Sequence, residues 1–348
     1  MLGGCRVAER PLVSVTIPTY ERREALRRAL ISLAHQTAPA DSYEVIVSVD
    51  GSHDGTHELL GALACPYPLR VAEGPKRGRA AACNAALELV RGDIVIVLDD
   101  DMQVAPEFIE RHRAHHPPGS RLCVLGAVPV GLDDDSPRAA RYVAAKFEAH
   151  LAKLARPDHV FVPRDFYSGN ASLRAAVLRE VGGFDDSFDA YGNEDVELSL
   201  RLRSAGVALV YDPAALARQE YGKELRGLAQ DTLAKGGTTV LLARRHPYVF
   251  GALRLAMPRD SSRPWLAARA VLLRLTRRLP PVAYAVFALA ALLERAGLWR
   301  APLFYRAVLD YAFWAGVDAK LCDVANDGEL ALLATELHRG PIDLLLHR

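Results

Sequence analysis

The apolar residues of the first 100 positions fall into short runs, and helix-patterned segments separate them. Four of these runs predict strands, over Val13–Ile17, Val45–Val49, Leu69–Ala72 and Ile94–Leu98. The last has five β-favouring apolar residues without a polar break, which is typical of a strand buried on both faces. Strand and helix alternate throughout this half, so we expect a parallel sheet with right-handed crossovers.

The regular alternation ends after about residue 104. Further helices are predicted over 106–115, 138–155 and 194–205, and further strands over 122–130 and 207–211. From about residue 214 the chain is rich in Ala, Leu and Arg and predominantly helical in pattern. The sequence therefore indicates an α/β domain followed by a helical region.

Three carboxylates, Asp99, Asp100 and Asp101, follow the buried run at its carboxyl end. They repel one another, and burying them without a counter-charge is costly. An isolated acidic triplet is typical of a solvated turn, but open α/β sheets bind ligands at this edge. Alternation predicts Asp99 and Asp101 on one side and Asp100 on the other. A divalent cation that bridges to phosphate would supply the missing charge.

Composition sets limits on the partners. The chain has 348 residues, of which 50% are hydrophobic and 24% charged, an ordinary globular balance. Its net charge of +1 gives no overall attraction to nucleic acid, so we expect no nucleic-acid partner. Residues 241–306, however, hold 12 Arg and no Lys against two acids, a local charge of +10. Such asymmetry indicates a surface that meets something anionic.

Cysteine usage and apolar stretches bear on location. Five widely spaced cysteines without a Cys-x-x-Cys pair argue against a disulfide framework or a zinc site, and suit a reducing compartment. Residues 1–10 lack the apolar core of a signal peptide. The apolar stretch 279–293 is shorter than the ~20 residues of a spanning helix. We expect a cytoplasmic protein, with peripheral attachment to the inner face of the plasma membrane as the alternative.

Separated motifs along the chain resemble those of the family 2 glycosyltransferases. They cover roughly residues 13–211 in the family's order: Ser14–Arg22, Val49–Thr56, Leu98–Asp101, Ser168–Arg174, Val181–Asp185 and Gly192–Leu198. The resemblance implies a GT-A fold, a Rossmann-like mixed sheet flanked by helices, here with a helical C-terminal extension. The predicted catalytic domain covers 1–214, with a nucleotide-sugar half at about 11–104 and an acceptor half at about 105–214. Residues 215–348 form the predicted helical region.

The resemblance also implies an activity. It is the transfer of a sugar, with inversion, from a nucleotide-sugar donor (we expect a UDP-linked one) to an acceptor hydroxyl. Asp99 and Asp101 match the family's metal-binding positions and would hold Mn²⁺ or Mg²⁺ against the donor diphosphate. Asp195 is the expected base, with Glu194 beside it, and a dry acidic pocket is expected to raise its pKa. A saccharide, a lipid-linked saccharide and a small metabolite all remain open as the acceptor.

The other site residues also follow from the resemblance. Gly169 and Asn170 are expected on the acceptor side. Lys76 and Arg77 flank a basic loop before a helix N-terminus, where a solvated loop is as plausible as a phosphate site. The expected nucleotide-binding residues are Pro18, Thr19, Tyr20, Glu21, Asp50, Arg79, Asp99 and Asp100.

The chain departs from the family pattern at one position near the metal. Many relatives place a His about 20 residues after the acidic pair, and here the stretch 217–223 has none. Gln219 or Arg218 takes that role in our prediction. Three histidines, His112, His115 and His116, are expected at a solvated helix end rather than in a metal site.

The basic C-terminal region has two interpretations. In one, its arginines and aromatic side chains meet anionic lipid head groups. In the other, the region is a helical cap on the catalytic domain with its arginines facing solvent. The residues concerned are Arg269, Arg274, Arg277, Arg278, Arg295, Trp265, Trp299 and Phe304.

Two other function classes fit the sequence less well. A nucleotidyltransferase also uses a carboxylate pair at a sheet end, but it needs a Gly-rich, Lys-containing loop after the first strand, and residues 18–22 are not such a loop. A non-catalytic module that binds nucleotides or membranes would predict a damaged acidic set. Asp50, Asp99, Asp101 and Asp195 are all present.

Overall fold

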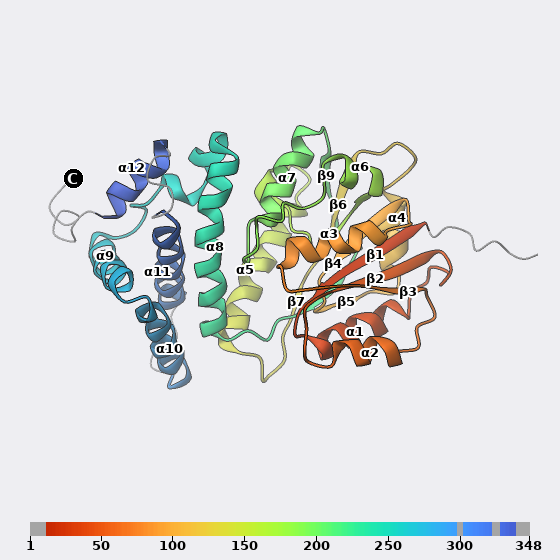
Figure 1. Ribbon diagram of the computed structural model, residues 1–348, viewed down its shortest axis with the longest axis horizontal. Helices are drawn as coiled ribbons and strands as arrows, with labels where there is room; N and C mark the ends of the chain where they lie inside the picture. The colour runs from red at the N-terminus through yellow and green to blue at the C-terminus, as the bar shows by residue number, and fades with distance from the viewer. Residues whose placement is uncertain (1–11, 298–301, 322–327, 339–348) are drawn as a thin grey trace, which may run out of the picture. The chain divides into compact units, whose positions relative to one another are not determined.

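The computed structural model describes residues 12–297, 302–321 and 328–338, and it divides into two compact units (Figure 1). Unit 1 comprises the chain up to Asp134, Val143–Asp189 and Glu194–Tyr221. Unit 2 comprises Asp135–Tyr142, Ala190–Asn193 and the chain from Gly222 onward. Each unit is described by itself.

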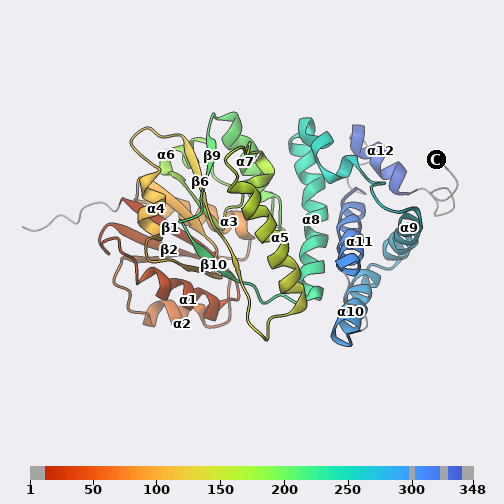
Figure 2. The same ribbon diagram turned by 180° about the vertical axis from the view of Figure 1, so that it is seen from behind.

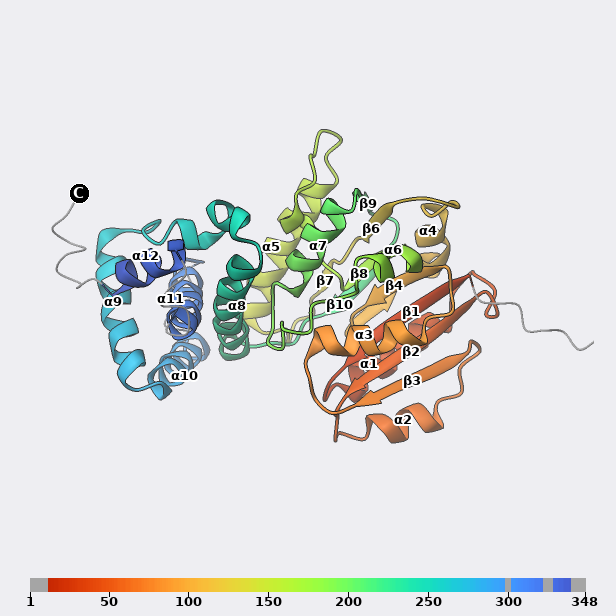
Figure 3. The same ribbon diagram turned by 45° about the horizontal axis from the view of Figure 1, so that its top comes forward.

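Unit 1 is built on a seven-stranded mixed sheet with the order β3-β2-β1-β4-β8-β6-β9 (Figure 3). β1 pairs in parallel with both β2 and β4, as the alternating pattern predicts. β8 runs antiparallel to both of its neighbours, so the sheet reverses direction there. The strands are β1 (Val13–Thr19), β2 (Tyr43–Asp50), β3 (Leu69–Gly74), β4 (Ile94–Leu98), β6 (Leu122–Gly126), β8 (Asn170–Arg174) and β9 (Ala208–Asp212).

Both faces of the sheet are buried, which confirms the reading of the unbroken run 94–98. On one face Ile94, Ile96 and Leu98 pack in a core with side chains of α1. Side chains of α2 and α4 join the same core. On the other face, Val95 and Val97 pack with side chains of α3, α5, α6 and α7. The helices of unit 1 are α1 (Arg23–Leu33), α2 (Thr56–Ala62), α3 (Arg79–Leu89), α4 (Phe108–Ala114), α5 (Arg138–Leu154, whose first residues belong to unit 2), α6 (Ala175–Glu180) and α7 (Glu194–Ser204).

A second, three-stranded sheet lies in unit 1, with the order β5-β10-β7. β10 (Ala217–Glu220) pairs antiparallel with β5 (Met102–Val104) and in parallel with β7 (Val130–Gly131). The prediction of a predominantly helical chain from about residue 214 therefore misses the strand Ala217–Glu220. Unit 1 extends past the predicted boundary at residue 214 because β10 returns to pair with β5, directly after the aspartate triplet.

Unit 2 is helical over the part of the chain that the structure describes. Helices α8 and α11 pack closely, because Gly236 and Gly316 lie at their crossing: a Cβ on Gly316 would be 1.8 Å from the carbonyl oxygen of Leu233. No helix among residues 12–297, 302–321 and 328–338 is long and apolar enough to span a membrane. Its helices are α8 (Leu225–Arg245), α9 (Arg263–Arg278), α10 (Pro281–Arg295), α11 (Pro302–Leu321) and α12 (Gly328–Leu337).

Candidate active site

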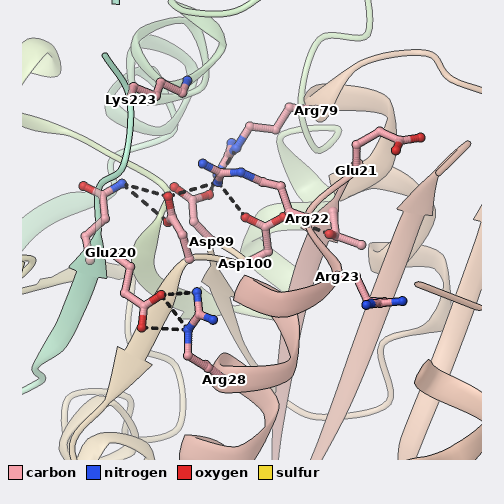
Figure 4. Close-up of polar contacts among 12 residues, drawn as sticks. Glu21, Arg22, Arg23, Arg28, Arg79, Asp99, Asp100, Glu220 and Lys223 are labelled. Atoms are coloured by element: carbon pink, nitrogen blue, oxygen red, sulfur yellow. Dashed lines mark hydrogen bonds and ion pairs between the residues drawn. The ribbon is translucent and has the colours of Figure 1, made fainter. Parts of the chain in front are cut away.

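The aspartate triplet forms a turn between β4 and β5, not a continuation of the strand. The predicted alternation is therefore wrong. Asp100 and Asp101 share one partner, Arg22, whereas Asp99 binds Arg79 (Figure 4). A turn rotates successive side chains by amounts that strand periodicity does not describe, and this separates Asp99 from the other two.

Arg22 clamps two buried carboxylates. Its Nη1 donates to Asp100 Oδ1 at 2.9 Å and to Asp101 Oδ2 at 3.0 Å. The hydroxyl of Thr19 donates to the other oxygen of Asp100 at 2.8 Å. Burial and the charge of Asp99 raise the pKa of Asp101 to about 6, and burial raises the pKa of Asp100. Arg22 stands in the first motif, but sequence reasoning did not assign it to the site, because nothing in the motif shows what its side chain contacts.

Arg79 is the residue on which the acidic groups converge. It begins α3, and its Nη2 donates to Asp99 Oδ1 at 2.6 Å. Its Nη1 donates to the hydroxyl of Ser168 at 2.8 Å and lies 3.5 Å from Asp195 Oδ1 and 3.8 Å from Glu194 Oε1. One guanidinium group therefore links the end of β4 to the start of α7.

Glu194 and Asp195 open α7 and have different surroundings. Glu194 is 5% exposed, and its Oε2 has no hydrogen-bond partner among the described residues. Burial and the charge of Asp195 raise the pKa of Glu194 to about 7. Asp195 is more open, with a side chain 28% exposed, and it accepts a hydrogen bond from Ser168. A raised pKa was predicted at this pair for Asp195, and the structure places one on Glu194.

The site carries more negative than positive charge. Two guanidinium groups stand against five carboxylates, a net charge of −3 when all are ionised: Arg22, Arg79, Asp99, Asp100, Asp101, Glu194 and Asp195.

Asp99 and Asp101 fit a hard divalent cation. Oxygen ligands are those that Mg²⁺ and Mn²⁺ prefer. The charge of Asp99 raises the pKa of Asp101, so a cation between them would relieve a repulsion that the structure shows. Within the described ranges, no group of three or more His, Cys, Asp or Glu is arranged to hold a metal by itself. Further ligands would have to come from a bound molecule or from solvent.

Asp50 holds a loop in place. Its carboxylate accepts hydrogen bonds from the backbone N–H groups of Arg77 at 2.7 Å and Gly78 at 3.0 Å. It therefore fixes the segment immediately before Arg79. Each oxygen accepts one bond from the loop and keeps a second lone pair, so the prediction that Asp50 binds the nucleotide stays a prediction.

The other predicted nucleotide-binding residues surround the end of β1. Pro18 and Thr19 are buried within the strand. Tyr20 is 39% exposed, and the ammonium group of Lys76 lies 3.7 Å from the centre of its ring. The carboxylate of Glu21 accepts from the backbone N–H of His53. Of these residues, Tyr20 alone combines exposure with a flat apolar face for a base.

Gly169 and Asn170 were both predicted on the acceptor side, and they differ. The carbonyl of Gly169 accepts from the N–H of Asp99 at 3.1 Å, and a Cβ on Gly169 would lie 2.3 Å from Asp99 Oδ2. Asn170 is fully buried: it binds His112 through Oδ1 and the carbonyls of Ala127 and Ala215 through Nδ2. The acceptor-side prediction for Asn170 is wrong, because its side chain is buried and both of its polar atoms bind other residues of the chain.

The predicted solvated histidine cluster is also wrong for two of its members. His112 lies on α4 and His116 lies two residues beyond its end, and both are buried against β8. Each binds the hydroxyl of Ser172 at 2.8 Å. Burial lowers the pKa of both to about 4. His115 pairs with Asp212.

Strand β10 carries both residues predicted to take the role of the missing histidine, and their side chains lie in different places. The Nε2 of Gln219 lies 3.4 Å from both carboxylate oxygens of Asp101. The side chain of Arg218 lies against Gly131 instead. Next in the strand, Glu220 binds Arg28, as Figure 4 shows. The geometry thus selects Gln219 over Arg218.

Comparison with known proteins agrees with this geometry. Residues 14–182 match the model of the family described as "Glycosyl transferase family 2". This part of the chain therefore forms a domain of that family. The chain is 30% identical over 239 residues to validoxylamine A glucosyltransferase of Streptomyces hygroscopicus subsp. jinggangensis, covering 62% of this chain and 55% of that protein. It is also 30% identical over 247 residues to pre-mycofactocin glycosyltransferase of Mycobacterium tuberculosis, covering 68% and 48%. The chain thus spans about half the length of these curated relatives.

Solved structures confirm the predicted GT-A fold. Mannosyltransferase PcManGT from Pyrobaculum calidifontis, in complex with GDP-Man and Mn²⁺, aligns with a TM-score of 0.56 at 21% identity, covering 90% of this chain and 88% of that one. S. aureus TarS 1-349 in complex with UDP-GlcNAc aligns with a TM-score of 0.51 at 17% identity, covering 90% of both chains. At these identities the likeness concerns the fold alone.

Proposed function

We propose that this chain is an inverting glycosyltransferase that moves a sugar from a nucleotide-sugar donor to an acceptor hydroxyl. The observation that carries the proposal is the convergence of the Asp99–Asp101 turn and the Glu194–Asp195 pair on Arg79. The family 2 domain and the binding of GDP-Man and UDP-GlcNAc by proteins of the same fold support it.

Asp99 and Asp101 are the proposed holders of Mn²⁺ or Mg²⁺. When bound, such an ion neutralises the charge that develops on a departing nucleoside diphosphate. Arg79 is the proposed phosphate ligand of the chain itself, because it lies beside Asp99 at the N-terminus of α3, where backbone N–H groups also favour an anion. Asp50 keeps the preceding loop in position, and Tyr20 offers a face for the base.

Asp195 is the proposed base. The acceptor O–H loses its proton to this carboxylate while the oxygen forms a bond to the anomeric carbon, and the bond from that carbon to the diphosphate oxygen breaks. A single displacement of this kind inverts the anomeric configuration. Ser168 and Arg79 hold Asp195 in place, and its partial exposure leaves it open to an acceptor. Glu194, buried beside it, is a positioning residue rather than a second base.

The donor we propose is a UDP-sugar, and GDP-linked sugars are the competing class, since GDP-Man occurs in one structure of this fold and UDP-GlcNAc in another. The curated relatives are named for validoxylamine A and pre-mycofactocin. Hydroxylated small metabolites are therefore the first acceptors to screen.

A thermal-shift panel of UDP-, GDP- and dTDP-sugars, with and without Mn²⁺, tests the donor site. We expect one donor to raise the melting temperature in a metal-dependent manner, and the Asp101→Asn variant to lose that shift. The Glu88→Gln variant, at an exposed position of α3, is the matched control and should keep it. If no nucleotide stabilises the chain at millimolar concentration, the proposed donor site is wrong.

A further inference from the structure

Helices α9 and α10 of unit 2 expose large apolar side chains in two consecutive stripes. Only Leu279 and Pro280 separate the helices, so the stripes meet at this junction. Figures 1 and 2 show α9 on the side of α11 that faces away from α8. The α9–α10 face, as we call it, comprises Val271, Arg274, Leu275, Arg278, Leu279, Tyr284, Leu289 and Leu292, of which Leu279 is 61% and Leu292 63% exposed.

The stripe on α10 is one side of a helix that is apolar all round. Its exposed positions recur every three or four residues and fall within about 140° of the helix circumference. The opposite side is buried and packs through Phe287, Ala290 and Ala291. A helix of this composition is normally buried on every side. Half of α10 therefore lacks a partner within the described chain, and a patch of this kind marks an interaction site.

Three of the arginines predicted to meet lipid are used inside unit 2, which corrects that list. Arg269 is buried and binds Asp310 at 3.0 Å. Arg277 binds Asp318 at 2.8 Å, and Arg295 binds Glu224. Trp265 is also engaged internally, through a hydrogen bond to Asp310, while Trp299 lies outside the described residues.

Arg274 and Arg278 are different. Both are exposed beside the apolar stripe of α9, and neither makes an ion pair or hydrogen bond with a residue that the structure describes. The one acid of α9 and α10, Glu294, is buried and accepts a hydrogen bond from Tyr305. The exposed charge on the two helices is therefore positive, next to apolar side chains.

We propose that the α9–α10 face docks on the surface of an anionic lipid bilayer. An apolar stripe bordered by arginines is the pattern of an element that lies in the membrane interface, where each cation near the surface contributes about fivefold to binding. A second copy of this chain fits the face less well, because the exposed charge on both contacting surfaces would be positive. The proposal does not depend on the proposed transferase activity.

Co-sedimentation of the full chain with phosphatidylcholine vesicles, with and without phosphatidylglycerol, tests this surface. We expect binding only to the anionic vesicles, weakened by salt. The double variant Arg274→Gln/Arg278→Gln should bind roughly 25-fold more weakly, from two contributions of about fivefold each. Leu289→Asn/Leu292→Asn should also lose binding. Arg203→Gln/Arg226→Gln, at exposed positions on other helices, removes the same charge and should bind like the wild type.

Three outcomes would overturn the proposal. The wild-type chain could stay in the supernatant with anionic vesicles. The control pair could lose as much binding as the Arg274/Arg278 pair, which would indicate attraction by net charge alone. Light scattering could show a dimer that Leu289→Asn/Leu292→Asn dissociates, in which case a second copy occupies the face. Because all substituted side chains are exposed, circular dichroism should show that every variant is folded.

Discussion

Removing the charge of Glu194 should stabilise the protein at alkaline pH. Its carboxyl group is 5% exposed, one oxygen has no partner in the described chain, and the pKa is raised from 4.5 to about 7 by burial and by Asp195. Between these two values the folded chain binds more protons at Glu194 than the unfolded chain does. The free energy of unfolding therefore falls as the pH rises through this window.

The size of the effect follows from the shift. Each pKa unit corresponds to about 1.4 kcal/mol, so ionising Glu194 in the folded state costs about 3 kcal/mol by pH 8. Glu194→Gln avoids that cost but leaves a buried amide with incomplete hydrogen bonding, which takes back about 1 kcal/mol. We expect the variant to be about 2 kcal/mol more stable than the wild type at pH 8, and no more stable at pH 4.

Urea unfolding of the wild type, Glu194→Gln and the exposed control Glu88→Gln at pH 4, 6 and 8 measures this difference. Groups that do not interact with Glu194 contribute equally to wild type and variant, so the difference reports Glu194 and its interaction with Asp195. If Glu194→Gln follows the same pH dependence as the wild type, the carboxyl group is not held at a cost and the reasoning fails. Stabilisation together with loss of transfer would show that the charge is kept for function.

Four further results are expected. Asp195→Asn should keep donor-induced stabilisation and lose about 10²–10⁴-fold in transfer rate, and unchanged turnover would remove it as the base. Arg22→Gln leaves two buried carboxylates without their cation, so the chain should lose about 3 kcal/mol of stability at pH 8 and less at pH 4 in urea titrations. Gly169→Ala should weaken Mn²⁺-dependent donor binding in the thermal-shift assay, because its Cβ would displace the Asp99 carboxylate. Burial lowers the pKa of the His112 imidazole to about 4, so between pH 6.5 and 4 its protonation favours the unfolded chain. His112→Gln should therefore reduce the loss of stability over this pH range. An unchanged loss of stability would contradict this.

The pattern of apolar and capping residues predicted those helices and strands whose structure depends mainly on their own residues. The run 94–98 is a strand with the predicted bounds, and the helix predicted to begin at Glu194 does so. Strands β8 and β10 were missed, because each is short and polar and forms only through pairing with segments far away in the chain.

The same distinction holds for the site. Motifs identified Asp99, Asp101 and Asp195, since their place at strand and helix ends can be read from sequence. They did not reveal that Arg22 joins two of the aspartates or that Ser168 supports Asp195. They also placed Asn170 on the acceptor side, whereas its side chain is buried, because burial depends on what packs over a residue and not on the residue itself.

The position of Arg79 has a consequence for how the affinity for a donor responds to salt. This guanidinium group already contacts three carboxylates, so a diphosphate that binds Arg79 as proposed would replace one anionic partner by another. Replacing one anionic partner of Arg79 by another changes the number of ion pairs less than adding a new ion pair does. Donor affinity should therefore depend only weakly on ionic strength, whereas an arginine free in solvent would make it fall steeply. Without a donor, these carboxylates keep Arg79 in position, and a donor would have to displace at least one of them.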